Sequence, residues 1–198
     1  IYVQDERGDI NQREDPNIVL TTKDETTGKT KTTSNTVTIT AENEGDTANV
    51  TLKDVHIETE SSWNNTGSAP IEIKGNGDTN LELNGDNTVL SGDRHHAAIE
   101  KADKNGTGTL TIKDDLNDDN STPKDKDENG NAVGGDTGKL LAGGYGDGAG
   151  IGGGYNGITD LSYANTSNIT IKGGEITARG GYEDGAGIGG GTDGNAKN

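Results

Sequence analysis

Residues 148–154 read Gly-Ala-Gly-Ile-Gly-Gly-Gly, and residues 185–191 repeat the same seven letters. The flanks agree as well, because Gly-Gly-Tyr-Gly-Asp at 143–147 corresponds to Gly-Gly-Tyr-Glu-Asp at 180–184. Two nearly identical segments indicate a repeat architecture, in which each repeat is a unit that stacks on its neighbour.

Fainter copies of the repeat lie upstream and supply three short apolar patterns. A small-x-Ile pattern also occurs at Ala97-Ala98-Ile99 and Ala69-Pro70-Ile71. A second pattern alternates apolar residues after Asn or Thr, at residues 49–52, 80–83, 109–112 and 168–171. A third, short apolar pair follows each of these, at residues 55–57, 89–90, 140–141 and 176–178.

The spacing of the second pattern is regular over the first half of the chain. Leu52 and Leu83 are 31 residues apart, and Leu83 and Ile112 are 29 apart. Ile112 and Ile171 are 59 residues apart, but only one set of apolar pairs lies between them. The excess therefore predicts two insertions, at residues 113–138 and 155–167.

These patterns predict an all-β fold, a right-handed parallel β-helix with three short strands in each turn of about 30 residues. Alternation turns Val, Ile and Leu to one face of each strand, and Gly and Asn suit the corners because they accept positive φ. An antiparallel β-sandwich also has strands about every 10 residues, but it does not explain near-identical sequence at one period.

We divide the chain into three parts. Residues 1–35 are polar and acidic and form an N-terminal cap or edge segment, which solenoids use to cover strand edges. Residues 36–191 form the β-helix with its two insertions. Residues 192–198 carry no capping signal, so we expect the native protein to continue beyond them.

Composition limits the partners. Of the 198 residues, 26% are hydrophobic and 33 are glycine, and the formal net charge is −17. Nucleic acid and anionic membranes are therefore disfavoured, and cations such as Ca²⁺ are favoured. No apolar run reaches the ~18 residues of a membrane span. The absence of cysteine fits a secreted protein without disulfides. We expect an extracellular monomer.

The glycine motif also satisfies the pattern G-x-G-x-x-G, which a dinucleotide site uses. Such a site needs a strand before the motif and a long amphipathic helix after it. Helical periodicity follows neither copy, so the motif is interpreted as a strand and corner of the β-helix.

The first insertion contains a candidate calcium loop, Asp125 to Asp136. Oxygen side chains at loop positions 1, 3, 5 and 12, with glycine at position 6, match the spacing of a calcium loop, although flanking helices are absent. The alternative is a solvated acidic loop. The candidate ligands are Asp125, Asp127, Asn129, Asn131 and Asp136.

The two glycine motifs predict a column of stacked side chains. In register, Tyr145 lies over Tyr182, and Asp147 over Asp184. The carboxylates then share a proton or a cation, or serve as the pair of a retaining glycosidase. The tyrosines form either a platform for sugar rings or an aromatic ladder that only covers the corner.

Other residues could join this site. Tyr155 and Tyr163 lie in the second insertion, where they could form its wall. Trp63, the only tryptophan, is a candidate contact residue or packs on a neighbouring turn. Arg94 could be the base of a lyase, but with His95 and His96 it also fits an exposed polar turn. Adjacent histidines on an extended chain point in opposite directions, which argues against a metal ion shared by His95 and His96.

Residues 168–181, followed by 185–191, resemble Gly-rich repeat modules of large secreted or wall-anchored proteins of Gram-positive bacteria. Residues 50–112 are similar to proteins of that group described as containing carbohydrate-binding domains. The resemblance covers roughly residues 36–191 and implies a β-helix in a cell-surface setting. It assigns no functional residue.

The leading hypothesis is an extracellular adhesion or display module that binds a glycan or another cell-surface ligand. The resemblance and the predicted tyrosine column support it. The alternatives are a polysaccharide lyase or glycoside hydrolase on the same fold, and a passive stalk between other domains.

Overall fold

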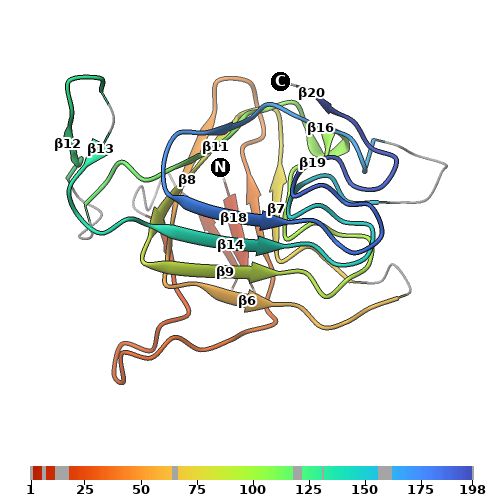
Figure 1. The fold of residues 1–198 in the computed structure, drawn as a ribbon, viewed down its shortest axis with the longest axis horizontal. Helices are drawn as coiled ribbons and strands as arrows, with labels where there is room; N and C mark the ends of the chain where they lie inside the picture. Colours follow the sequence, from red (N-terminus) through yellow and green to blue (C-terminus); the bar gives the residue numbers. More distant parts are fainter. Residues whose placement is uncertain are drawn as a thin grey trace.

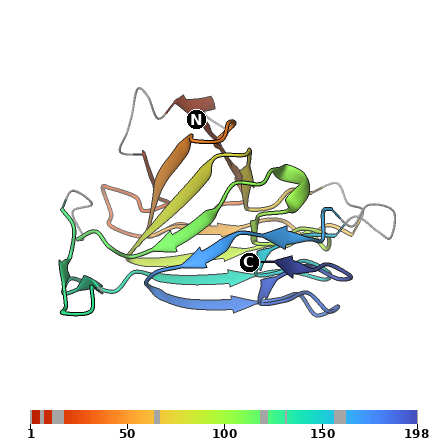
Figure 2. The same ribbon diagram turned by 90° about the horizontal axis from the view of Figure 1, so that it is seen from above.

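The computed structural model is a parallel β-solenoid, and it describes residues 2–5, 8–11, 18–63, 67–117, 122–130, 132–155 and 162–197. The chain adds one strand to each of three sheets in turn and then begins the next level. Figure 2 shows the colours running from red at one end of the stack to blue at the other. The predicted parallel β-helix is therefore confirmed.

The three sheets run along the solenoid, and Figure 1 shows the third with its strands in chain order. The first sheet contains β4 (Val37–Thr40), β7 (Ile71–Lys74), β10 (Ile99–Glu100), β15 (Ile151–Gly152) and β19 (Ile188–Gly189), with β1 (Tyr2–Asp5) and β2 (Gly8–Asn11) antiparallel at one edge. The second contains β3 (Ile18–Leu20), β5 (Thr47–Lys53), β8 (Asp78–Asn84), β11 (Leu110–Lys113) and β17 (Ile169–Ile171). The third contains β6 (His56–Glu58), β9 (Asp86–Leu90), β14 (Lys139–Gly143) and β18 (Glu175–Arg179).

Smaller elements lie outside these sheets. The hairpin of β12 (Asp125–Lys126) and β13 (Ala132–Val133) belongs to the segment between β11 and β14. A short parallel pair joins β16 (Thr166–Ser167) to β20 (Ala196–Lys197). A single turn of 3₁₀ helix, η1 (Asp103–Asn105), follows β10.

A column of isoleucines fills the interior beside the first sheet. Ile71, Ile99, Ile151 and Ile188 are partners on successive levels, which is the small-x-Ile pattern of the sequence. The first three are fully buried, whereas Ile188 is 45% exposed because β19 is the last strand of its sheet. Stacked apolar columns of this kind form the core, since each level alone buries too little surface.

The register of the second sheet differs from the spacing of the sequence pattern at one step. Ile112 pairs with Leu81, 31 residues away, and not with Leu83. The prediction that Leu83 and Ile112 occupy equivalent positions on successive levels was therefore wrong. Leu81 and Leu83 are both buried, because side chains two residues apart face the same side of a strand. A shift of two residues therefore leaves the hydrophobic pattern unchanged, and only the pairing of backbones reveals it.

The glycine motif forms β15, β19 and their corners, where neighbouring backbones lie close together. Gly152 has a φ of 136°, and Gly189, its partner one level on, has a φ of 140°. A Cβ atom on Gly152 would lie 1.9 Å from the carbonyl oxygen of Gly189. Glycine is required at this position by both the conformation and the contact.

Candidate functional site

Four successive levels place one large side chain each at the corner between the third and first sheets. Trp63 follows β6, Arg94 follows β9, Tyr145 follows β14 and Tyr182 follows β18. The backbone fixes this alignment, because Arg94 donates its N–H to the carbonyl of Ser62 at 3.1 Å, and Ile151 pairs with Ile188. We call these four residues the aromatic corner.

The rings of the aromatic corner contact one another. The Tyr145 and Tyr182 ring centroids lie 5.3 Å apart with the planes at 82°, so the two tyrosines are neighbours as predicted but meet edge to face rather than stacked. Trp63 extends the column, at 6.0 Å from Tyr145 and 81°. Edge-to-face geometry of this kind is favourable for aromatic pairs. Trp63 and Tyr182 nevertheless remain 57% and 59% exposed.

Arg94 forms ion pairs and a cation–π contact with other residues at the aromatic corner. Its Nε lies 3.1 Å from Oδ2 of Asp147, its Nη2 forms an ion pair with Glu183, and its Cζ lies 5.8 Å from the Trp63 ring centroid. The hydrogen bond to Glu183 raises the pKa of Arg94, so the guanidinium stays charged. A cation over an aromatic face is attracted by it, and this contact orients the indole.

The two aspartates of the repeat occupy different environments. Asp147 is 4% exposed, and the Arg94 guanidinium lies against its carboxylate. Asp184 is exposed and has a φ of 78°. Asp147 therefore acts as a buried anchor for Arg94, while Asp184 lies at the surface.

The two histidines that follow Arg94 in the sequence contact different residues. His95 stacks on Tyr155, with ring centroids 5.7 Å apart, and its Nε2 is 4.0 Å from Asp147. His96 contacts a different residue, Glu100, with 2.8 Å between Nδ1 and Oε2. Burial lowers the pKa of His96, but the hydrogen bond to Glu100 and the charges of Glu100, Asp93 and Glu72 together outweigh it, so the net shift of this pKa is upward.

The two tyrosines of the second insertion contact the solenoid at different places. Tyr155 donates its backbone N–H to the carbonyl of His95 and so lies directly behind the aromatic corner. Tyr163 packs instead on Lys104, whose Nζ is 3.5 Å from the ring centroid. Tyr155 is thus close to the predicted site, whereas Tyr163 contacts the segment that contains η1.

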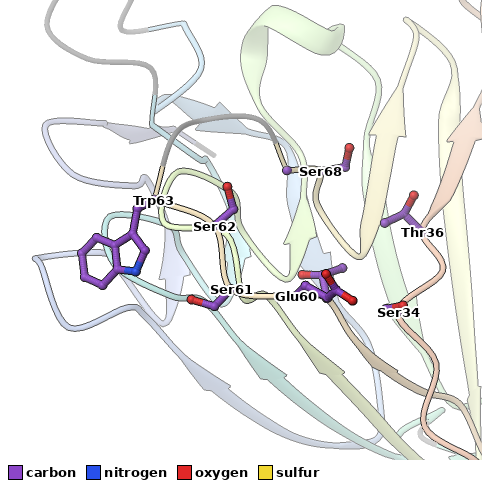
Figure 3. A pocket seen from close by; sticks show the side chains of 9 residues that line it. Ser34, Thr36, Glu60, Ser61, Ser62, Trp63 and Ser68 are labelled. Carbon is purple, nitrogen blue, oxygen red and sulfur yellow. The ribbon is translucent and has the colours of Figure 1, made fainter.

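A polar groove adjoins Trp63. It has a volume of about 620 Å³, and in Figure 3 Trp63 lies at one end with Ser34 and Thr36 at the other. Apart from Trp63 and Gly67, its lining consists of hydroxyl groups and one carboxylate: Ser34, Thr36, Thr59, Glu60, Ser61, Ser62 and Ser68. Sequence reasoning missed these residues, because they come from two separate levels and carry no motif.

The candidate calcium loop is a β-hairpin. Asp125 lies on β12 opposite Val133, and the Asp127 carboxylate accepts the N–H of Asn129 at 2.9 Å inside the turn. Asp136 is exposed on the far side of β13, and Asn131 lies outside the described residues. Within the described part of the chain, no three His, Asp or Glu side chains are grouped to hold a metal ion.

No protein-family model, curated protein or solved structure matches this chain. Among the described residues, no helix is long and apolar enough to cross a membrane.

Proposed function

We propose that this protein binds glycans through the aromatic corner and the adjoining polar groove. The observation that carries the proposal is the exposure of Trp63 and Tyr182, each more than half exposed while joined through Tyr145 into one column. Exposed aromatic rings in a fixed array are typical of contact surfaces, because they provide apolar area with few torsions to immobilise.

The chemistry of the two neighbouring surfaces suits a sugar. The apolar faces of pyranose rings pack on aromatic rings, and sugar hydroxyls exchange hydrogen bonds with side-chain hydroxyls and carboxylates. The groove provides these groups from Ser34, Thr36, Thr59, Glu60 and Ser62. Its volume of about 620 Å³ lies in the range of small-ligand sites.

We infer an extracellular setting, as an adhesion or display module. The resemblance of residues 168–191 to Gram-positive surface repeats supports it, together with the absence of cysteine and the net charge of −17. A role for Ca²⁺ at the hairpin, and a monomeric state, stay predictions from the sequence.

The enzyme alternative receives less support from the geometry. Arg94, the sequence candidate for a catalytic base, forms ion pairs with Asp147 and Glu183, which favour its protonated form. Asp147 is engaged with the same guanidinium. A passive stalk remains the alternative to binding.

A glycan array, followed by calorimetric titration of the best ligand, tests the proposal. We expect Trp63→Ala and Tyr182→Ala each to weaken binding about 5- to 30-fold, since a stacked aromatic contact contributes about 1–2 kcal/mol. Both side chains are exposed, so the variants should fold, and circular dichroism verifies this.

Tyr163→Ala is the matched control, because it removes an aromatic ring that packs on Lys104 in another part of the molecule. It should leave affinity unchanged. No ligand on the array would favour the stalk. Equal affinity of the Trp63 and Tyr182 variants and the parent would overturn the aromatic corner as the binding site.

A further inference from the structure

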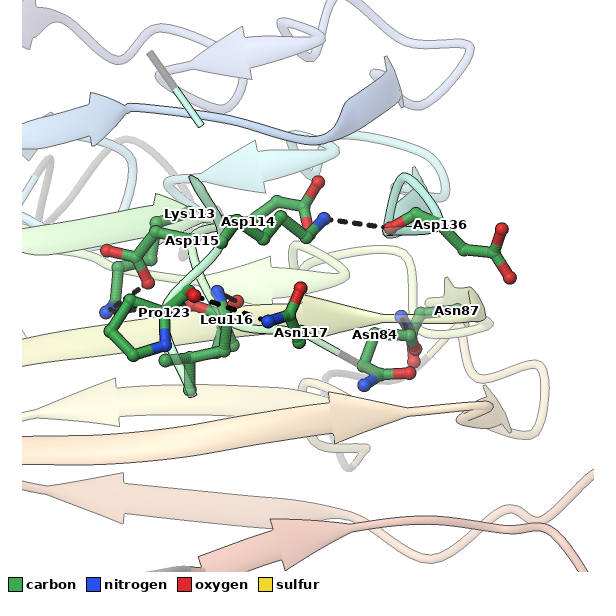
Figure 4. A network of polar contacts seen from close by, with 11 residues as sticks. Asn84, Asn87, Lys113, Asp114, Asp115, Leu116, Asn117, Pro123 and Asp136 are labelled. Atoms are coloured by element: carbon green, nitrogen blue, oxygen red, sulfur yellow. Dashed lines mark hydrogen bonds and ion pairs between the residues drawn. The ribbon is translucent and has the colours of Figure 1, made fainter. Parts of the chain in front are cut away.

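A second cleft lies where the first insertion leaves the solenoid, and Figure 4 shows the polar network beside it. The cleft has a volume of about 510 Å³. It lies between the ends of β11 and β17 and the hairpin of β12 and β13. Its charged lining residues are Lys113, Asp114, Asp115, Lys126 and Lys172.

One column of the second sheet explains the basic character of this cleft. Glu82 pairs with Lys113 in the ladder, and Lys172 is one level further on, because Ile112 pairs with Ile171. Lys113 has carboxylates nearby, with its Nζ 2.8 Å from Asp115 and 3.6 Å from Glu82. Along the chain, Gly173 and Gly174 follow Lys172 where Asp114 and Asp115 follow Lys113, so the next level lacks both acids.

The acids that do line the cleft are engaged. Asp114 is nearly buried and lies 2.6 Å from Nζ of Lys124, which also donates to the carbonyl of Asp136 at 2.8 Å. Asp115 is paired with Lys113. In contrast, no described residue forms an ion pair or hydrogen bond with the side chains of Lys126 or Lys172, and both are exposed. The cleft thus presents two exposed ammonium groups that form no direct ion pair with a described residue, although the charge of Lys126 acts on Asp115, on a chain that carries 34 acidic residues against 17 basic ones.

At acidic pH, Glu82 at the base of the column does not add a negative charge to the cleft. It is 3% exposed, and its Oε1 accepts the N–H of Leu116 at 2.8 Å. Burial, and next the interaction with Asp115, raise the pKa of Glu82 to about 7, against the opposing effects of the Leu116 N–H and Lys113. The carboxyl group is therefore largely protonated below this pH.

We propose that this cleft binds an anionic sugar, whose carboxylate is held between Lys126 and Lys172. The volume of about 510 Å³ exceeds what a bare ion fills and suits a short oligosaccharide. Thr137 and the backbone of the glycines in the lining provide hydrogen-bonding groups for its hydroxyls. This site uses no residue of the aromatic corner, so it stands independently of the function proposed above.

The charge at the base of the column makes binding depend on pH. The groups that face Glu82 are Asp115, Lys113 and the Leu116 N–H, and Lys126 also acts on Asp115. As pH rises through about 7, Glu82 ionises and repels an anion in the cleft. Affinity for an acidic sugar should therefore be higher at acidic than at alkaline pH.

Calorimetric titration at constant ionic strength tests the site with three probes: an oligogalacturonate, a neutral galactose oligosaccharide of the same length, and inorganic phosphate. We expect the oligogalacturonate to bind and the neutral oligosaccharide not to bind. The double variant Lys126→Gln/Lys172→Gln should weaken binding by up to about 25-fold, since two ion pairs of up to about fivefold each are removed. Lys29→Gln, which removes one exposed charge from a distant loop, should not change it.

The remaining outcomes decide the assignment. Oligogalacturonate binding that the Lys126/Lys172 variant retains, or that the neutral oligosaccharide matches, would overturn the proposal. Binding of phosphate without oligogalacturonate would overturn the sugar and leave a simple anion site. Loss of oligogalacturonate binding in Trp63→Ala would mean that the aromatic corner binds it; retained binding there supports two separate sites.

Discussion

The aromatic corner and the insertion cleft are two surfaces of one solenoid that arise in opposite ways. The corner consists of equivalent positions on four successive levels, so stacking itself brings Trp63, Arg94, Tyr145 and Tyr182 together. The cleft exists because one level carries an insertion and the next level, at Gly173 and Gly174, does not. Regular stacking therefore builds a repetitive contact surface, while a break in regularity builds an enclosed and charged one.

The comparison predicts, first, that glycines of the stacked levels tolerate substitution far less than glycines of the insertion. Gly152→Ala should destabilise the fold by more than about 4 kcal/mol, because the new Cβ meets the carbonyl of the next level at a strained φ. Gly130→Ala is the matched variant: its φ is 83°, but its Cβ would contact nothing within 4 Å. It should cost about 1 kcal/mol.

Denaturant unfolding of the two glycine variants checks this difference. Similar losses for Gly152→Ala and Gly130→Ala would mean that the close approach of the levels is not a main constraint on the fold.

The second prediction concerns the attachment of the insertion. Lys124→Ala leaves the Asp114 carboxylate nearly buried without its partner at 2.6 Å, which should cost about 3 kcal/mol. Because Lys124 contacts Asp114 and the carbonyl of Asp136, the loss should concentrate in the insertion. Hydrogen exchange should accelerate in residues 122–138 and stay slow in the buried strands β8 and β11. Faster hydrogen exchange along the whole chain would contradict the idea that Lys124 holds only the insertion in place.

The third and smallest effect is a pH dependence of stability from Glu82. Its pKa is about 7 in the folded chain against an ordinary value of 4.5, so the unfolded chain releases this proton first as pH rises. The contribution of Glu82 is thus most favourable below pH 4.5 and is lost as pH rises to about 7. Glu82→Gln, which keeps a donor towards Asp115, should leave stability near pH 4 unchanged and raise it by about 1–2 kcal/mol at pH 8.

Thermal unfolding at these two pH values measures the effect. Glu175→Gln, on the exposed face of β18, is the control with no expected pH-dependent gain. A gain of the same size at both pH values would indicate a change in packing rather than in ionisation.

The sequence predicts the stacked parts of this molecule well, because equivalent positions on successive levels carry the same type of residue. Ile151 and Ile188, and Tyr145 and Tyr182, are each 37 residues apart, and each pair is in contact or in register. The position of Arg94 beside them was not predicted, since the next step, from Arg94 to Tyr145, is 51 residues and includes the first insertion.

The cleft could not be predicted for a related reason. Its lysines come from β11, the hairpin and the residue after β17, and their proximity depends on how the insertion folds back. Periodicity contains no information about that path. The sequence drew attention to the acids of the insertion, whereas the structure pairs Asp114 and Asp115 with Lys124 and Lys113 and leaves Lys126 and Lys172 without a direct ion pair to a described residue.

The parallel pairing of levels has a mechanical consequence. Neighbouring levels are joined by backbone hydrogen bonds directed along the stack, from β4 to β7, β10 and beyond. A force applied along that axis loads the hydrogen bonds between one pair of levels after another. It therefore separates one level from the next, instead of shearing several strands at once. Stretching the molecule should release chain in steps of about one level of the stack, with the longest release where the level carries an insertion.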